Sequence, residues 1–216
     1  MLTSVSAEPG RWRTNRTPYL KEPMDRFTDP LIEKIVLCFG AQLGKTETEL
    51  NMIGYALDQT SSPTMMVYPT DTIAKFASDK RVQPMIKSVK SISDKFDENS
   101  KLLELDFNNG NYMVLVGANS PSSLSSRSIK YLFFDEIDKY PAFAGKEADP
   151  IKLATERTKT FVDKKIVMVS TPTVESGNIW QAFMKANERR QYYVPCPHCG
   201  VSQTLKFKQI KWPEEH

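Results

Sequence analysis

A lysine and a threonine follow a short loop in the stretch FGAQLGKTE, residues 39–47. The stretch ends like a phosphate-binding loop, G-x-x-x-x-G-K-[ST], but Phe39 stands where that pattern has its first glycine. In such loops the lysine reaches the β- and γ-phosphates and the hydroxyl binds Mg²⁺, roles that fall on Lys45 and Thr46. The pattern alone leaves open a degraded loop, a variant loop and a chance match. The loop residues that would face the phosphates through their backbone are Gly40, Gln42 and Gly44.

Two acids follow a run of four apolar residues in the stretch YLFFDE, residues 131–136. At the end of a buried strand, Asp135 would hold Mg²⁺ and Glu136 would orient and deprotonate an attacking water. The alternative is a pair of acids that merely meets solvent at the end of a strand. The distance of 90 residues from Lys45, in a chain of alternating strands and helices, favours the catalytic interpretation.

Ser170 and Thr171 follow a third apolar run, residues 166–169. Small hydroxyl residues at this place can contact the γ-phosphate and respond to its loss. Ser, Thr and Pro also favour turns, so simple turn chemistry explains the stretch equally well.

These residues need strands and helices that bring them together. Short apolar runs predict buried strands, and apolar residues at helical spacing predict helices between them. An Asn/Gly turn near residue 110 predicts a hairpin. The alternation predicts an α/β fold with a mostly parallel sheet and helices on both faces. With the loop and acid motifs, the expected fold class is that of a P-loop NTPase (RecA-like, ASCE). The carboxyl ends of its strands would carry the site. The predicted strands are 35–39, 65–68, 102–107, 112–116, 131–134 and 166–169, and the predicted helices are 46–57, 72–89 with a break near Pro84, 150–161 and 179–190.

Length and composition are those of one ordinary globular domain. The chain has 216 residues, 40% apolar and 25% charged, with a formal net charge of +3. A charge this small does not by itself indicate nucleic acid. No apolar run approaches a membrane span, and the N-terminus lacks the apolar segment of a signal peptide, so we expect a cytoplasmic protein.

Cys196 and Cys199 form a CxxC in the stretch YYVPCPHCG, residues 192–200. The stretch reads as a zinc knuckle between two short strands, but zinc needs four ligands and only two are present. We expect an incomplete zinc site, either because the chain is a piece of a longer protein or because the site has decayed. A redox CxxC needs a helix after its first cysteine, and Pro197 and Gly200 argue against one.

The combination of these motifs resembles the large terminase subunit of tailed bacteriophages, in the branch related to the lambda large subunit. The resemblance covers nearly the whole chain. Loops of that family often lack the first glycine, which favours a variant loop. The resemblance implies an ATPase motor that packs double-stranded DNA into a procapsid. It is carried by residues 39–47, 131–138, 170–178 and 194–200, with support from 8–14, 17–20 and 117–120.

Residue by residue, the resemblance assigns phosphate and Mg²⁺ binding to Lys45 and Thr46. It implies that Asp135 is the metal-binding acid and Glu136 the catalytic glutamate. Ser170 and Thr171 match the coupling motif, in which many terminases have alanine at the middle position.

Further assignments depart from the family pattern. Arg127 falls where terminases place an arginine that acts on a neighbouring subunit, although a solvent-exposed loop arginine is an equal alternative. Tyr19 matches an adenine-contacting segment that often reads Tyr-Gln, but Leu20 follows it here. Ala41 replaces an arginine found in many terminase loops, so one phosphate contact is absent or supplied elsewhere.

We therefore expect an extended N-terminal arm over residues 1–24 with an adenine contact, an ATPase domain over 25–191, and a partial zinc-ribbon-like segment over 192–216 that leads to an absent nuclease domain. The expected cofactors are ATP, Mg²⁺ and, if its site is complete, Zn²⁺. The expected partners are double-stranded DNA, the small terminase subunit, the portal or procapsid, and further copies in a ring. DNA contacts are expected from basic residues at 185–190 and from residues 68–70, Lys80 and Arg81. Alternatives are a helicase-like nucleic-acid-dependent ATPase and a nucleotide-binding remnant without turnover.

Overall fold

A six-stranded sheet organises the larger part of the computed structural model, which describes residues 10–60, 62–146, 149–209 and 211. Its order is β1-β6-β5-β2-β4-β3, and only β3 runs antiparallel to its neighbour. The strand prediction is confirmed, including the hairpin. The strands are β1 (Lys34–Cys38), β2 (Thr64–Tyr68), β3 (Glu104–Asp106), β4 (Tyr112–Gly117), β5 (Tyr131–Asp135) and β6 (Lys165–Ser170).

The central strands are buried on both faces, which explains their continuous apolar sequences. Every residue of β2, β5 and β6 is buried, whereas β1 at the edge is only partly covered. Cys38 pairs with Ser170, and Val169 pairs with Asp135. The ends of β1, β6 and β5 therefore lie in one row, and the segments that follow them are neighbours.

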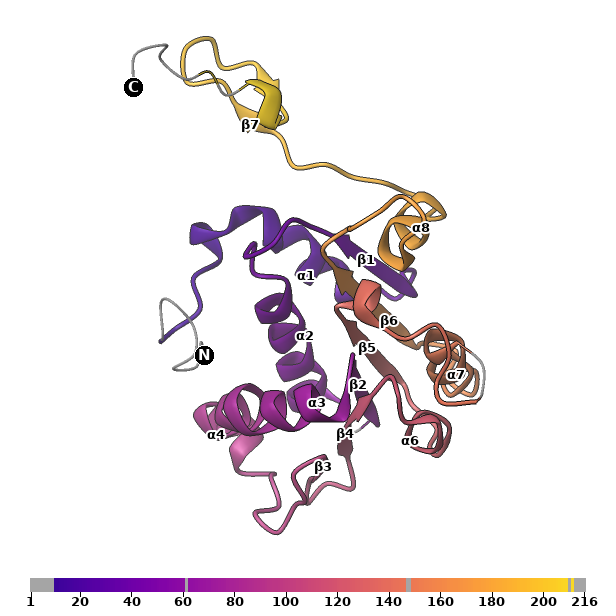
Figure 1. Cartoon of the computed structure of the whole chain (residues 1–216). Helices are drawn as coiled ribbons and strands as arrows, with labels where there is room; N and C mark the ends of the chain where they lie inside the picture. Colours follow the sequence, from indigo (N-terminus) through magenta and orange to yellow (C-terminus); the bar gives the residue numbers. More distant parts are fainter. Residues whose placement is uncertain (1–9, 61, 147–148, 210, 212–216) are drawn as a thin grey trace. The chain divides into compact units, whose positions relative to one another are not determined.

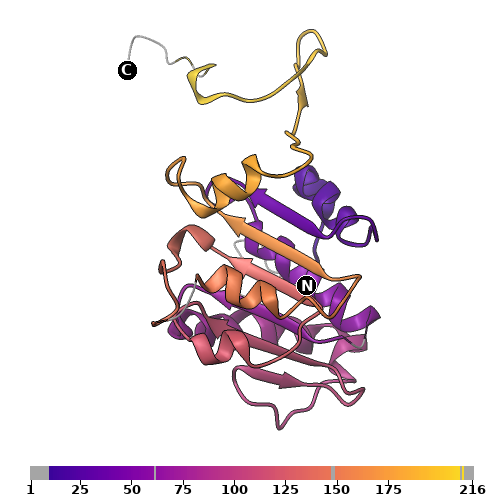
Figure 2. The same cartoon turned by 90° about the vertical axis from the view of Figure 1, so that its right-hand side faces the viewer.

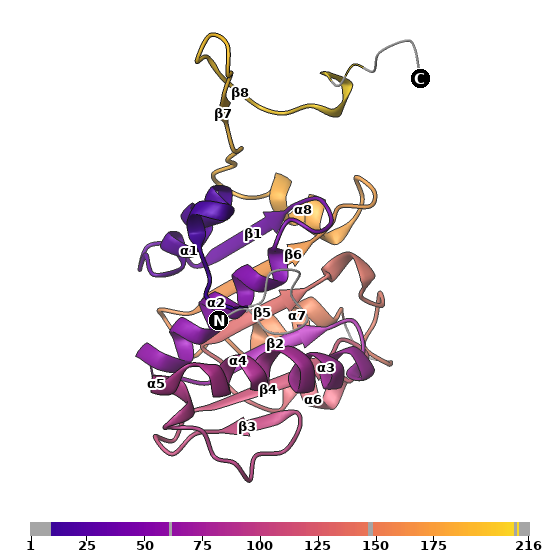
Figure 3. The ribbon, with the colours of Figure 1, turned by 90° about the vertical axis from the view of Figure 1, so that its left-hand side faces the viewer.

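Five helices cover one face of the sheet, in front of the strands in Figure 3. The main one, α2 (Lys45–Gln59), buries Leu50, Ile53 and Leu57 against the sheet at the predicted spacing. A short π-helical turn, Ser78–Val82, lies between two further helices of this face. Pro84 is the second residue of the helix that follows this turn. The other four helices of this face are α1 (Lys21–Phe27), α3 (Asp71–Ala77), α4 (Gln83–Ser88) and α5 (Lys90–Ser93).

Three helices and a 3-10 turn cover the opposite face, which Figure 2 turns toward the viewer. They pack around Leu124, Ile137 and Ile179 in a second core. Figure 1 shows both layers edge-on with the sheet between them, so the predicted helices on both faces are confirmed. These elements are α6 (Pro121–Ser125), α7 (Pro150–Glu156), α8 (Asn178–Met184) and the turn η4 (Ile137–Lys139).

Two local predictions are wrong. Residues 14–24 are not extended: two 3-10 turns, Thr14–Arg16 and Pro18–Leu20, lead into α1, because Pro18 suits a first helical position and Leu20 is fully buried. The predicted arm's residues 1–9 lie outside the described residues. The helix predicted over 179–190 stops at Met184, since the polar sequence after it offers no apolar face to bury.

The chain divides into two compact units, Met1–Lys185 and Ala186–His216. The predicted domain boundaries were residues 24 and 191, and α1 continues across the first of them. The second unit contains a small antiparallel pair, β7 (Val194–Pro195) with β8 (Ser202–Gln203), and a 3-10 turn, Phe207–Gln209.

Candidate phosphate and metal site

The loop of residues 39–44 connects β1 to α2 as a phosphate-binding loop must. Two of its residues have left-handed backbone conformations, Gln42 with φ 58° and Gly44 with φ 78°. Glycine suits the second position doubly, because a Cβ on Gly44 would also lie 2.9 Å from Leu20 Cδ1. The Gly44 carbonyl accepts a hydrogen bond from the Thr48 amide at 3.0 Å, so the loop passes directly into the helix.

Lys45 is buried at the head of α2 and joins two segments. Its Nζ donates to the Gly40 carbonyl at 2.7 Å and to Thr171 Oγ1 at 2.9 Å. Burial lowers the pKa of Lys45, whereas neighbouring carboxylates, chiefly that of Asp135, act in the opposite direction. The lysine predicted to bind phosphate is thus held by its own loop and by the segment after β6.

Asp135 and Thr46 meet as the predicted metal pair. Thr46 Oγ1 donates to Asp135 Oδ2 at 3.2 Å, and Asp135 is only 5% exposed. Burial, with a smaller effect of Glu136, raises the pKa of Asp135 to about 6. Its Oδ1 is buried and has no hydrogen-bond partner among the residues described. A buried, unpartnered carboxylate oxygen beside a hydroxyl fits Mg²⁺, which prefers oxygen ligands.

Glu136 follows directly but in a strained backbone. Its φ of 55° is left-handed, a conformation uncommon outside glycine. Its Oε2 accepts a hydrogen bond from Lys139 Nζ at 2.7 Å. The carboxylate predicted to act on water is therefore paired within its own turn.

Ser170 is the last residue of β6 and Thr171 follows it, and the two side chains contact different segments. Thr171 contacts Lys45, while Ser170 Oγ accepts a hydrogen bond from the backbone amide of Asp138 at 3.3 Å. Only Thr171 therefore reaches the phosphate-binding lysine directly.

Tyr19 lies beside the start of the loop. Its ring meets Phe39 edge to face, with centroids 6.4 Å apart. The neighbouring Leu20 packs against Gly44. The helical N-terminal segment thus brings an aromatic ring to the phosphate loop, where a base could stack.

Arg127 lies elsewhere, at the other edge of the sheet. Its guanidinium pairs with Glu104 of β3 and stands over the Tyr112 ring, 5.6 Å from the centroid. Hydrogen bonds from Lys101 and from Arg127 lower the pKa of Glu104. The structure therefore does not bring Arg127 to Lys45 of the same chain.

The sequence reasoning missed Glu49, one helical turn after Lys45. Glu49 is fully buried, both its carboxyl oxygens are unpartnered within the described part of the chain, and burial raises its pKa well above the usual range. Its spacing from Lys45 and Ile53, four residues each way, places all three on one helix face and could have revealed it.

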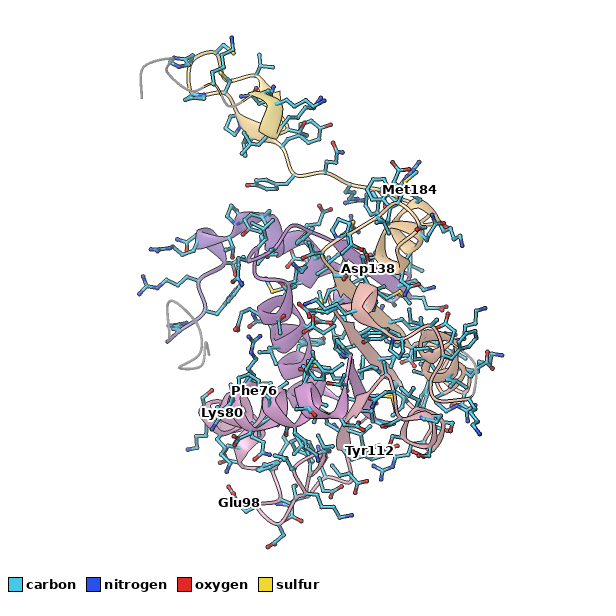
Figure 4. All side chains as sticks on the ribbon, in the orientation of Figure 1. Phe76, Lys80, Glu98, Tyr112, Asp138 and Met184 are labelled. Carbon is cyan, nitrogen blue, oxygen red and sulfur yellow. The ribbon has the colours of Figure 1, made fainter. Side chains whose placement is uncertain are left out.

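The predicted DNA contacts at residues 68–70, Lys80 and Arg81 differ in exposure and in partners. Tyr68 is 3% exposed and donates to the Met66 sulfur, so it is wrong as a DNA contact. Lys80 is exposed and pairs with Asp79; Figure 4 shows it on the helical segment with Phe76. The charge of Arg81 instead opposes the burial-driven rise in the pKa of Asp135.

Cys196 and Cys199 are free thiols in the second unit. Backbone N–H groups of Cys199 and His198 lower the pKa of Cys196. Across the described residues no group of three or more His, Cys, Asp or Glu side chains is arranged to hold a metal. The residues present thus do not fit a zinc site.

In the part of the chain that the structure describes, none of the helices combines the length and apolar character needed to cross a bilayer.

Comparisons with known proteins agree with this geometry. Residues 6–216 match the family described as phage terminase large subunit gpA, ATPase domain. The large terminase subunit of Enterobacteria phage P21 is 28% identical over 210 residues, and that of Escherichia phage lambda is 24% identical over 213. These matches cover 94% and 95% of this chain but only 32% and 33% of the relatives.

The fold is also that of a solved terminase domain. The large terminase ATPase domain of Thermus phage P74-26 superposes with a TM-score of 0.61 at 17% identity, over 92% of this chain and 78% of that one. The family match spans nearly every residue and includes all the motifs above. The chain belongs to the family of phage terminase large subunit gpA ATPase domains.

Proposed function

We propose that this chain binds and hydrolyses ATP with Mg²⁺ and that the hydrolysis drives double-stranded DNA into a procapsid. One observation carries the proposal: Lys45, Thr171 and the Asp135–Thr46 pair converge at the carboxyl ends of β1, β6 and β5. This is where parallel α/β sheets bind their ligands.

The residues divide the chemistry among them. Lys45 exchanges its bonds to Gly40 and Thr171 for the β- and γ-phosphates. Thr46 and Asp135 would hold Mg²⁺, and the bound ion would supply positive charge that neutralises the phosphate oxygens. The backbone N–H groups of Gly40, Gln42 and Gly44 face the phosphates.

Glu136 orients the attacking water and accepts its proton. To do so the carboxylate gives up its bond to Lys139, a pair on the surface that contributes little free energy. Thr171 responds to the γ-phosphate because its hydroxyl loses the hydrogen bond that Lys45 donates to it, and Ser170 anchors the start of the same segment. Tyr19 stacks on the adenine next to Phe39.

Arg127 completes the site of a neighbouring copy. It lies at the sheet edge opposite β1, so one subunit's arginine faces away from its own phosphates. Such an arginine can accelerate phosphoryl transfer by about 10³ to 10⁵. The proposal therefore includes a homo-oligomeric ring.

We propose double-stranded DNA, the small terminase subunit and the portal or procapsid as packaging partners, in the host cytoplasm. Membership of a phage terminase large subunit family supports this proposal. DNA contacts at residues 185–190 would be to phosphates and would weaken steeply with salt.

The test is titration of the chain with a fluorescent ATP analogue and Mg²⁺, followed by ATPase assays with double- and single-stranded DNA. We expect wild type to bind and Lys45→Ala to lose binding, with the surface variant Lys159→Ala unchanged because that lysine only pairs with Glu156. Stimulation by double-stranded DNA alone would support packaging. Preference for single strands would favour a helicase-like enzyme, and binding without turnover even in mixtures of subunits would favour a remnant.

A further inference from the structure

The Asp138 side chain lies beside the site and accepts hydrogen bonds from two further segments. Its Oδ2 accepts from the backbone N and from Oγ1 of Thr173, both at 3.2 Å, and its Oδ1 accepts from the Ile179 amide at 2.7 Å. Figure 4 labels Asp138 near the start of α8. Its own amide donates to Ser170 Oγ. One residue of η4 thus holds the end of β6, the loop of residues 171–177 and the first turn of α8.

Gly177 shows how closely this carboxylate is enclosed. Its backbone, with φ −64° and ψ 152°, suits any residue. A Cβ there would nevertheless lie 2.5 Å from Asp138 Oδ2, an oxygen that accepts two hydrogen bonds from Thr173. Glycine is therefore required by the approach of Asp138 rather than by the backbone conformation.

The loop of residues 171–177 is held at two places by groups of different kinds. At its start Thr171 accepts from Lys45, which a phosphate would take away. Further along, Thr173 is held by Asp138, which has no contact with the phosphate-binding lysine. A second bond, from Asn178 Nδ2 to the Ile137 carbonyl at 3.1 Å, joins α8 to the same turn.

We propose that Asp138 is a positioning residue that links the loop of residues 171–177 to the turn carrying Glu136, so that occupancy of the phosphate site is transmitted to Glu136 and α8. The inference rests on the proposed function. When Lys45 turns to a phosphate, the Thr171 end of the loop is released while the Thr173 end stays fixed to η4. Asp138 lies two residues after Glu136 in that turn, so a shift of the loop changes the direction of the catalytic carboxylate.

The competing explanation is a helix cap with no further role. The chain contains a matched example in Asp149, whose Oδ1 accepts from the Ile151 amide at 2.8 Å at the start of α7. Both aspartates accept a hydrogen bond from the second amide of a seven-residue helix, Asp149 as the N-cap residue itself and Asp138 from a separate turn. Asp149 has no bond to the loop after β6 among those described. Asp149→Asn thus measures the effect of a cap alone.

The experiment compares wild type, Asp138→Asn and Asp149→Asn by hydrogen exchange, with and without Mg²⁺ and a slowly hydrolysed ATP analogue. In wild type and Asp149→Asn we expect the analogue to change exchange at residues 171–179 and at 137–140 together. In Asp138→Asn we expect the change near Thr171 to remain and the change at 137–140 to disappear. Where ATP turnover is measurable, Asp138→Asn should lower kcat about a hundredfold with analogue affinity unchanged.

Two milder variants keep the test valid if Asp138→Asn folds poorly. Thr173→Val removes one hydroxyl donor and keeps the cap on α8, and Gly177→Ala displaces the carboxylate without changing it; both should uncouple the two segments. If the analogue changes hydrogen exchange in Asp138→Asn and Thr173→Val in the same way as in Asp149→Asn, the inference is overturned and the proposed function is unaffected. Failure of wild type to bind the analogue would overturn the proposed function and this inference with it.

Discussion

Two polar clusters of the sheet are built differently, one at the carboxyl ends of β1, β6 and β5 and the other at the β3 edge. Around Lys45 and Asp135 the side chains are buried, and several carboxyl oxygens have no hydrogen-bond partner within the described residues. Around Arg127 and Glu104 the side chains are about one-third exposed, and the charges pair with each other. The first cluster is costly without a ligand, whereas the second is complete as it stands.

The two clusters differ in how they hold their charged groups in the absence of a ligand or a neighbouring copy. Buried, unsatisfied groups reduce the stability of the empty protein, and in the proposed function phosphate and Mg²⁺ would satisfy them. A partly exposed ion pair contributes little, so Arg127 can leave Glu104 at small cost. The first design suits a site within one chain and the second suits a residue that acts on a neighbour.

The largest effect is expected for Glu136→Gln. Removing the base should lower ATP turnover by about 10² to 10⁴ while leaving nucleotide binding intact, as single-turnover and titration assays would show. Glu156→Gln is the matched control, since Glu156 also pairs with a lysine three residues later. Equal turnover in both variants would remove Glu136 from the mechanism.

A smaller effect with a defined pH dependence is expected for Asp135→Asn. The folded-state pKa is about 6 against an ordinary value of 3.8, so the ionised carboxylate destabilises the metal-free fold at neutral pH. The substitution should raise the free energy of unfolding by about 3 kcal/mol at pH 7 and by about half as much at pH 5. Urea unfolding without Mg²⁺ measures both values.

Asp163→Asn is the control of opposite sign. A hydrogen bond from Lys130 lowers the pKa of Asp163, so its charged form is favoured in the fold and the amide should bring no gain at pH 7. A stability gain in Asp135→Asn that does not change with pH would contradict the assignment of its cost to ionisation.

The smallest effect is expected for Arg127→Ala in the isolated chain. Loss of its partly exposed pair with Glu104 should change the free energy of unfolding by about 0.2–1 kcal/mol, measured by urea unfolding, and analogue binding should stay the same. The lost activity should appear only in assemblies and should be restored in part when Arg127→Ala and Lys45→Ala subunits are mixed. A weakened analogue affinity in the single chain would contradict a role in trans.

The sequence was sufficient to predict the sheet and the segments at its carboxyl edge, because buried strands and glycine loops have strong local patterns. Lys45, Thr46 and Asp135 meet as the order of these segments implies. The contact of Asp138 with Thr173 could not be predicted, since it depends on how two turns approach in space. The helical N-terminal segment was missed because its stability comes from Leu20 packing on Gly44, a tertiary contact.

The left-handed backbone of Glu136 lowers the stability of the fold at a position whose carboxylate is proposed to act in catalysis. A residue with a Cβ costs about 1–3 kcal/mol in such a conformation, and glycine would relieve most of that cost. A library of variants selected for heat resistance alone would therefore enrich glycine at position 136, and those survivors would lack the carboxylate. Directed evolution of a more heat-resistant variant would have to exclude position 136 from randomisation and obtain its stability gains at other positions.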